Sequence, residues 1–307
     1  MRVLVAGATS VPGLPLLREL NSRGHEVTGV TRSPSKTSQI QAAGAKPVVA
    51  DVFDVDEIDK VVADVAPDVV ISLLTTLPKW GPKRPKDFEP AKKLWSIGAP
   101  NLVRAAQRNG VRRVVAESVV FAYGYPTSGP PVVDETDLYP GPPPKGGDAM
   151  LAALRGMEQT VLTSGEHSDT EGIVLRYGIF YGPEVPHDEL FTRLAKWWAM
   201  PALTGDGIAS WIHIDDVAKA TAEAITKGRG GQVYNIVDDR PQSFGDYVRE
   251  LSAKLGRPRP LPISHRLVGL DWTPNSPVKL GGRFSNVAFK PSPRSLDGRN
   301  AAFHAAT

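Results

Sequence analysis

The chain has 307 residues, among them 28 prolines and no cysteine. The lack of cysteine excludes disulfide scaffolds, cysteine nucleophiles, iron–sulfur clusters and thiolate zinc sites, and no apolar run approaches the ~18 residues of a membrane span. A hydrophobic content of 41% allows a folded core, and the formal net charge is only +3. Residues 240–307 are strongly basic, which indicates either a solvated surface or a surface that faces an anionic ligand.

The beginning of the chain does not resemble a signal peptide, because its apolar stretch is short and a glycine turn follows it. We therefore expect a cytoplasmic protein with no membrane partner. No basic run is interleaved with aromatic residues, so nucleic acid is not expected as a partner either.

Short β-branched runs alternate with helical patterns along the chain. Strands are predicted at Val3–Ala6, Val27–Val30, Pro47–Ala50, Val69–Leu74, Val114–Ala116, Ile173–Arg176 and Val233–Val237. Helices are predicted at Leu14–Ser22, Asp56–Val65, Ala99–Arg108 and Asp148–Ser164. This alternation predicts an α/β fold with a Rossmann-like, doubly wound parallel sheet.

The same alternation suggests how the chain is divided. We expect residues 1–170 to form an NAD(P)-binding Rossmann domain, with returning strands from 171–182 and 208–240. Residues 183–307 would form a smaller, interleaved C-terminal portion that binds substrate.

Half of the prolines lie in two segments, Pro126–Pro144 and Pro258–Pro293. Proline at this density excludes a continuous helix or a central strand. The first segment leads directly into the predicted helix at Asp148–Ser164, so it indicates a stiff loop at the mouth of the active site.

A glycine turn follows the first predicted strand and opens a helix, which is the context of a dinucleotide-binding motif. Gly7 permits the tight turn, and Gly13 lets the helix pack close to the strand. The helix N-terminus would then offer N–H groups to a pyrophosphate. Ser10 replaces the middle glycine of the motif, so a Rossmann-like fold with an empty pocket stays open as an alternative.

Arg32 ends the second predicted strand, and Lys36 lies nearby. An acidic residue there would bind a ribose 2′-hydroxyl and select NAD(H), whereas arginine suits a 2′-phosphate. We therefore expect NADP(H) in preference to NAD(H), unless Arg32 is only a solvated surface charge. Asp51, after the third strand, is placed either to accept a hydrogen bond from the adenine amino group or to cap a turn.

Several motifs, in order over residues 1 to about 255, resemble those of the extended short-chain dehydrogenases/reductases of the NAD-dependent epimerase/dehydratase type. The matching pieces are VLVAGATSVPG, Ala50-Asp51, Ser118–Gly124, Leu175–Pro183, Trp211–Val217 and Tyr234–Asp238. The resemblance implies cofactor contacts from Gly7, Thr9, Ser10, Val11, Pro12, Gly13, Asp51, Val52, Leu73, Leu74, Thr75, Tyr177 and Gly178. It also implies a homodimer.

The resemblance further implies a Tyr-x-x-x-Lys pair on the helix at Asp148–Ser164, with tyrosine as general acid/base and lysine lowering the pKa of that tyrosine. Met150 and Leu154 stand at these two positions, and the helix contains neither Tyr nor Lys. Ser118 and Tyr123 remain as the candidates for proton delivery.

The candidates for substrate contact are Trp80, Phe121, Asp148, Trp197 and Trp211. Tryptophans would line a flat pocket for a ring-bearing molecule, although core packing is their common role. Asp148 is placed to act as a general acid or as a helix N-cap. No metal site is expected, because His213 has no metal-ligand neighbours.

These observations predict an NADP(H)-dependent oxidoreductase-like enzyme with a non-standard proton relay, acting on a small organic molecule. Two alternatives stay open. One is a non-redox cyclase, isomerase, dehydratase or lyase on the same scaffold. The other is a non-catalytic protein that senses NADP.

Overall fold

A seven-stranded parallel sheet forms the centre of the computed structural model, which describes residues 1–76, 85–124, 132–133, 135, 148–166, 168–197, 201–204, 208–264 and 288–289. The strands are β1 (Arg2–Ala6), β2 (Glu26–Thr31), β3 (Lys46–Val49), β4 (Val69–Ser72), β5 (Arg113–Val119), β7 (Glu171–Tyr177) and β12 (Gln232–Ile236). Their order is β12-β7-β5-β4-β1-β2-β3, and every neighbouring pair is parallel. The predicted doubly wound Rossmann-like fold is confirmed.

The apolar sequence of β1 explains its place in the middle of the sheet. Side chains alternate between the two faces of a strand, so Leu4 and Ala6 enter one core cluster while Val3 and Val5 enter the other. A strand buried on both faces has no polar side to offer to water, which is typical of parallel sheets covered by helices.

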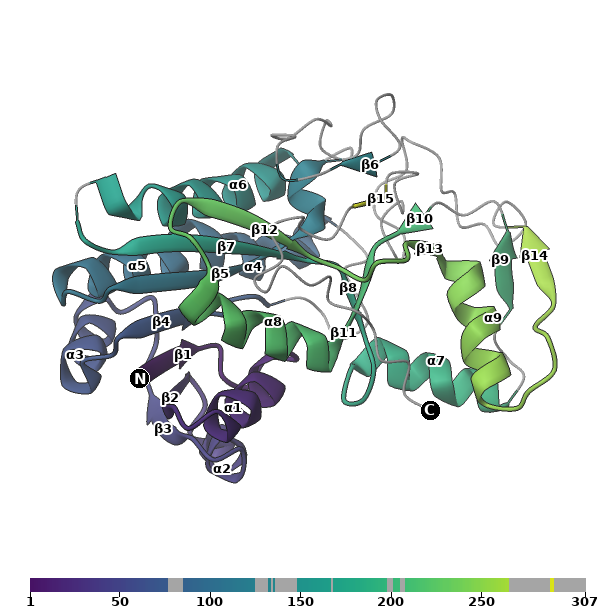
Figure 1. Cartoon of the computed structure of the whole chain (residues 1–307), viewed down its shortest axis with the longest axis horizontal. Coiled ribbons are helices and arrows are strands. Elements are labelled where there is room, and N and C mark those ends of the chain that lie inside the picture. The colour runs from purple at the N-terminus through teal and green to yellow at the C-terminus, as the bar shows by residue number, and fades with distance from the viewer. Residues whose placement is uncertain are drawn as a thin grey trace.

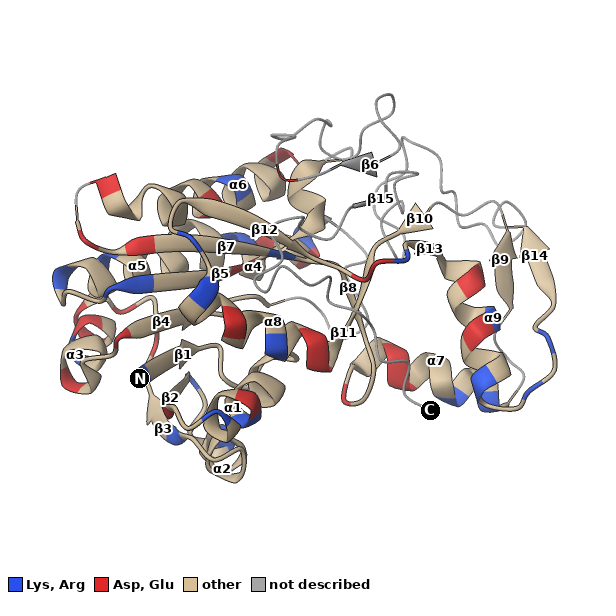
Figure 2. Ribbon diagram, viewed as in Figure 1, with Lys and Arg blue, Asp and Glu red and all other residues tan. Residues whose placement is uncertain are grey.

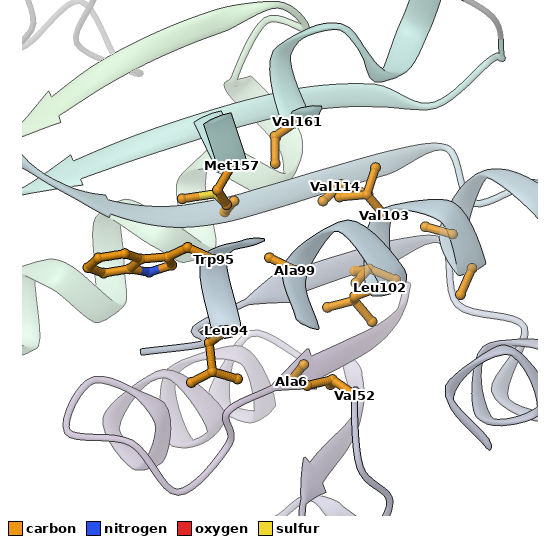
Figure 3. Close-up of a cluster of buried hydrophobic side chains, with 14 of the residues drawn as sticks. Ala6, Val52, Leu94, Trp95, Ala99, Leu102, Val103, Val114, Met157 and Val161 are labelled. Atoms are coloured by element: carbon orange, nitrogen blue, oxygen red, sulfur yellow. The ribbon is translucent and has the colours of Figure 1, made fainter. Parts of the chain in front are cut away.

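Helices cover both faces of the sheet (Figure 1). One face packs against α1 (Gly13–Ser22), α2 (Thr37–Ala42) and α8 (Ile214–Lys227). The other packs against α3 (Val55–Val65), α4 (Glu89–Lys93), α5 (Ala99–Arg108) and α6 (Asp148–Leu162). On this second face Trp95, Leu102, Val114 and Met157 belong to one buried cluster, part of which is drawn in Figure 3.

A smaller group of elements lies at the other end of the molecule from α3 and α5, to the right in Figure 1. It contains α7 (Pro186–Lys196), α9 (Phe244–Lys254) and four two-stranded pairings. These pairings join β8 (Ile179–Tyr181) to β11 (Trp211–His213), β9 (Ala202–Thr204) to β14 (Pro262–Ser264), β10 (Ile208–Ala209) to β13 (Gln242–Ser243), and β6 (Val132–Val133) to β15 (Ala288–Phe289).

Aromatic stacking builds the core of this group. The Trp211 ring lies 4.4 Å from that of Tyr247, at an angle of 9°, and the Trp211 indole N–H donates to the carbonyl of Gln242 (3.0 Å). The Tyr247 hydroxyl donates to Asp188 of α7. Trp211 is thus held in the protein interior, with only 1% of its surface exposed.

The basic residues of the C-terminal part are described as far as residue 264, and several are paired. Arg249 contacts Asp246 at 2.6 Å, and Arg240 contacts Glu250 at 2.9 Å. Figure 2 shows both signs of charge along α9. In this part of the chain the pairing agrees with a solvated surface rather than a surface built for an anion.

Two features are absent from the part of the chain that the structure describes. None of its helices is long and apolar enough to cross a membrane. Nor does this part contain a group of three or more His, Asp or Glu side chains that could hold a metal ion.

Candidate functional site

The glycine turn after β1 sits tightly against the end of β4. Gly7 has a φ of +81°, and a side chain on it would collide with the backbone oxygen of Leu73. The Leu73 N–H in turn donates to the carbonyl of Ala6 (2.8 Å). A side chain at Gly13 would collide with the carbonyl of Ala8. The backbone therefore requires glycine at both positions and forms a close-fitting turn where β1 and β4 diverge.

This turn leads into α1, whose N-terminus has polar groups available to bind an anion. Pro12 caps the helix without a side-chain hydrogen bond, and no acidic residue lies in its first turn. The Ser10 hydroxyl oxygen is buried and has no hydrogen-bond partner among the described residues. A buried polar atom beside a helix N-terminus fits a phosphate group, so the residues present are suited to a dinucleotide.

A cavity of about 640 Å³ lies at the carboxyl ends of β2, β3 and β4. It is lined by Arg32, Phe53, Thr76, Glu89, Pro90, Lys92, Lys93, Leu94 and Ser96. Ligands of doubly wound sheets bind at this edge. Arg32 of the predicted cofactor site therefore faces a cavity, and we call it the adenosine-end cavity because Arg32, the expected ligand of a ribose 2′-phosphate, lines it.

Asp51 and Val52 lie beside this cavity in the turn that precedes α3. The Asp51 carboxylate accepts from the Phe53 N–H (3.0 Å), and the Val52 carbonyl accepts from the Asn101 side chain (3.0 Å). Asp51 thus makes the turn-capping contact that the sequence offered as one of two roles. A bond to adenine stays a prediction.

Ser118 and Tyr123 belong to a buried polar cluster at the end of β5. The Ser118 hydroxyl donates to Glu158 Oε1 of α6 (2.5 Å), and Arg176 of β7 donates to both oxygens of Glu158 (2.8 and 2.7 Å). The Arg176 guanidinium lies 4.3 Å from the centre of the Tyr123 ring. Each of these four side chains is at most 1% exposed, so the cluster ties three elements together.

The Tyr123 hydroxyl is also engaged, since it donates to Asn235 Oδ1 of β12 (3.0 Å). Burial raises the pKa of Tyr123 to about 12. A phenol in this state is a weak acid at neutral pH. The catalytic roles of Ser118 and Tyr123 stay predictions, and the structure gives both hydroxyls structural contacts.

From the sequence, the family's Tyr and Lys are expected on α6, at the positions of Met150 and Leu154, and both side chains there are apolar. Met150 and Leu154 of α6 are 8% and 1% exposed, and both belong to the core cluster that contains Leu151 and Met157. This face of α6 therefore packs against the protein interior.

A second acidic group, Glu117, lies at the end of β5 beside Ser118. It is 7% exposed, and its Oε2 has no hydrogen-bond partner among the described residues. Burial raises the pKa of this carboxyl to about 8. The neighbouring Tyr177 is buried and hydrogen-bonded to Thr221 (2.6 Å), while Gly178 packs against the carbonyl of Ser210.

The predicted substrate residues differ in environment. Trp211 is buried, Phe121 is half-buried, and Asp148 is exposed at the start of α6. Trp197, at the end of α7, is 80% exposed. Trp80 lies outside the described residues, as does most of the proline-rich segment 126–144.

The sequence did not single out Glu158, which joins the buried polar cluster, or Phe53 and the two α4 lysines, which line the cavity. Glu158 had a signal, because it shares the apolar stripe of α6 with Leu151 and Leu154, and a charge on such a face needs a partner. Lys92 and Lys93 offered none, since adjacent lysines at the surface are common.

Comparison with known proteins agrees with this geometry. The family model of the NAD dependent epimerase/dehydratase family matches residues 3–237. The chain belongs to this family. The extended short-chain dehydrogenase/reductase resemblance expected from the motifs is thereby confirmed.

Relatives within the family include reductases of small molecules. The chain is 35% identical to a 3-diazoavenalumate denitrifying reductase from Streptomyces sp., over 278 residues that cover 88% of each chain. It is 26% identical to a 2'-dehydrokanamycin reductase from Streptomyces kanamyceticus, covering 84% of this chain and 68% of the relative.

Solved structures share the fold. The dTDP-glucose 4,6-dehydratase DesIV from Streptomyces venezuelae, with NAD and TYD bound, superposes with a TM-score of 0.76 at 18% identity, covering 99% of this chain and 94% of that one. A UDP-glucuronic acid 4-epimerase from Bacillus cereus, in complex with UDP-glucuronic acid and NAD, gives 0.74 at 22% identity, with coverages of 99% and 95%.

Proposed function

We propose that this protein is an NADP(H)-dependent reductase of a small, ring-bearing organic molecule, and that its acceptor requires no proton from a Tyr-x-x-x-Lys pair. Bound NADPH would supply a hydride. The reductase assignment is supported by the similarity to a denitrifying reductase and to a dehydrokanamycin reductase.

The residues for holding the cofactor lie along one edge of the sheet. Gly7, Ser10 and Gly13 would bind the pyrophosphate, supported by the close-fitting turn and the unpartnered Ser10 hydroxyl. Arg32 would bind the 2′-phosphate in the adenosine-end cavity. The NAD complexes of DesIV and of the Bacillus cereus epimerase support a dinucleotide on this fold.

The choice of acceptor depends on one observation, the buried apolar side chains of Met150 and Leu154 on α6. Reduction of a carbonyl needs a proton on the oxygen, which the family's tyrosine supplies. Ser118 and Tyr123 are both engaged in buried hydrogen bonds, and the raised pKa of Tyr123 opposes proton donation. An acceptor that needs no such proton therefore suits this site better.

A diazonium carbon is such an acceptor. When it takes up a hydride, the C–N bond breaks, its electron pair leaves with N₂, and the reduced carbon carries the new hydrogen. Charge balances without a proton, because the hydride neutralises the cation. The name of the denitrifying reductase, which specifies a diazo compound, supports this class of substrate for the present protein.

A cofactor-oxidation assay tests the proposal. Purified protein is mixed with NADPH or NADH and either a small arenediazonium salt or a cyclic ketone, and the loss of reduced cofactor is compared with the rate without enzyme. We expect turnover with NADPH and the diazonium salt. Ser118→Ala and Tyr123→Phe, the predicted proton donors, should keep this rate to within about threefold, since general acid catalysis typically contributes 10²–10⁴-fold.

Three results would contradict the proposal. Turnover of the ketone alone, with losses of about a hundredfold in Tyr123→Phe, would restore a conventional proton relay. NADPH binding without oxidation of any acceptor would favour the non-redox enzyme or the NADP sensor. Equal rates with NADH would remove the cofactor preference.

A further inference from the structure

We infer that Lys93 of α4 is a second ligand of the cofactor's 2′-phosphate, acting together with Arg32 from a different element of the adenosine-end cavity. The inference rests on the proposed NADP(H) dependence and adds to it a specificity residue that lies sixty residues along the chain from the β2 end.

The charges that line the cavity carry the argument. Among the described lining residues, the three cations Arg32, Lys92 and Lys93 are accompanied by one carboxylate, that of Glu89. The Lys92 ammonium is bound to Glu89 at 2.7 Å, so this pair is neutral. Within the described part of the chain, no carboxylate lies within ion-pair distance of Arg32 or Lys93. The cavity therefore keeps two uncompensated positive charges.

The Lys93 side chain contacts an aromatic ring. Its ammonium lies 4.5 Å from the centre of the Phe53 ring, and the backbone N–H of Phe53 is held by Asp51. A cation–π contact at an exposed site contributes about 0.5–1 kcal/mol, whereas a hydrogen bond to a charged group contributes about 1.5–3 kcal/mol. A phosphate therefore outcompetes the ring for the ammonium, or binds it from the side that faces away from the ring.

The geometry of α4 directs the side chains of Lys92 and Lys93 to different partners. Ala91 of α4 is fully buried and anchors the helix on the core. Successive residues of an α-helix point about 100° apart, so Lys92 and Lys93 leave this anchor in different directions. Lys92 reaches back to Glu89 one turn earlier, and Lys93 reaches to Phe53.

The chemical class that this arrangement recognises is a phosphate monoester on the ribose. Two cations from separate elements suit a dianion, while a ribose hydroxyl gains little from them. Lys93 is thus expected to act on the binding of NADP(H) and to leave NAD(H) unaffected.

The experiment uses calorimetry with two fragments of the cofactor, 2′,5′-ADP and 5′-ADP, on the full-length protein. Lys93→Ala is compared with Lys254→Ala, a control with the same residue type at an exposed position at the end of α9, outside the cavity lining. We expect Lys93→Ala to weaken 2′,5′-ADP about tenfold or more, since the loss of one charge-assisted hydrogen bond is worth that much. Binding of 5′-ADP should stay within about twofold in both variants, as should 2′,5′-ADP in Lys254→Ala.

The outcomes separate this inference from the proposed function. If the wild type binds 2′,5′-ADP no more tightly than 5′-ADP, the NADP(H) preference itself is wrong. If the wild type discriminates, Arg32→Ala removes the discrimination, and Lys93→Ala behaves like Lys254→Ala, then only the role of Lys93 is overturned. Thermal unfolding of each variant checks that both surface substitutions leave the fold intact.

Discussion

Glu117 carries a carboxyl group in an environment with little to stabilise its charge. Burial raises the pKa of this group from 4.5 to about 8, so the folded protein holds the proton more tightly than the unfolded chain. The contribution of this proton to the free energy of unfolding is fully present below pH 4.5 and is lost as the pH rises to about 8. Glu117 should therefore be a local source of weakness at alkaline pH.

Replacement of Glu117 by Gln removes this dependence. We expect the melting temperature of Glu117→Gln, relative to wild type, to increase steadily between pH 5 and pH 8, by about 3 °C or more. Differential scanning calorimetry across this range measures the change. Glu26→Gln, at an exposed position at the start of β2, is the matched control. The melting temperature of Glu26→Gln relative to wild type should not change with pH. If that of Glu117→Gln did not change either, Glu117 would be solvated.

Single residues also show where sequence reasoning stops. Arg32 could be placed at a cofactor site because its distance from the glycine turn is fixed along the chain. The burial of Glu117 and the cation–π contact of Lys93 could not be predicted, because both depend on elements distant in sequence. Asp51 was left with two roles, and only the fold revealed its bond to Phe53.

At the level of elements, α6 contains neither the Tyr nor the Lys that the family resemblance implies for this helix. The sequence predicted its position and its missing Tyr and Lys, but not that Met150 and Leu154 would pack in the core. Its Glu158 side chain is fully buried and joins β5 and β7 through Ser118 and Arg176. Both features make the helix a structural support.

Because Met150 and Leu154 pack in the core, a polar pair placed at these positions is expected to destabilise the protein. We expect Leu154→Lys to lower the free energy of unfolding by about 3 kcal/mol or more, because it places a charge in an apolar core. Leu154→Met, which preserves the volume, should cost less than about 1.5 kcal/mol. Urea unfolding measures both. A Lys variant as stable as the Met variant would mean that this face of α6 borders water.

The Glu158–Arg176 pair gives a second prediction for this helix. Glu158→Gln leaves the buried Arg176 guanidinium without its counter-charge, so we expect a loss of about 3–5 kcal/mol in unfolding free energy. Arg18→Gln, which breaks an exposed pair with Glu184, should cost less than about 1 kcal/mol. Similar small losses for both variants would contradict the burial of the cluster.

At the scale of the whole molecule, the central sheet could be predicted from sequence alone. Short apolar β-branched runs separated by amphipathic helices admit few topologies, and they predict a doubly wound parallel sheet, whose strand order the structure then provides. The smaller C-terminal group was harder to predict, because its strands have only two or three residues and its core consists of aromatic contacts between distant segments, such as Trp211 with Tyr247.

The whole molecule is therefore a family scaffold for which we propose a cofactor site at the glycine turn and hydride transfer without a Tyr-x-x-x-Lys pair. The turn at Gly7 is suited to a dinucleotide, Arg32 lines the cavity where we propose that the 2′-phosphate of NADP(H) binds, and α6 contains neither Tyr nor Lys. A reductase that transfers a hydride without a proton from a Tyr-x-x-x-Lys pair agrees with the glycine turn and with the apolar side chains of α6.

Isotope tracing with deuterium tests this account most directly. The protein is incubated with a small arenediazonium salt and NADPH deuterated at C4 of the nicotinamide in ordinary water, and in parallel with unlabelled NADPH in deuterated water. We predict that the hydrogen on the reduced carbon comes from the cofactor, so that the product carries deuterium only in the first experiment. Deuterium from the solvent alone, or unreacted substrate despite bound NADPH, would contradict hydride transfer by this protein.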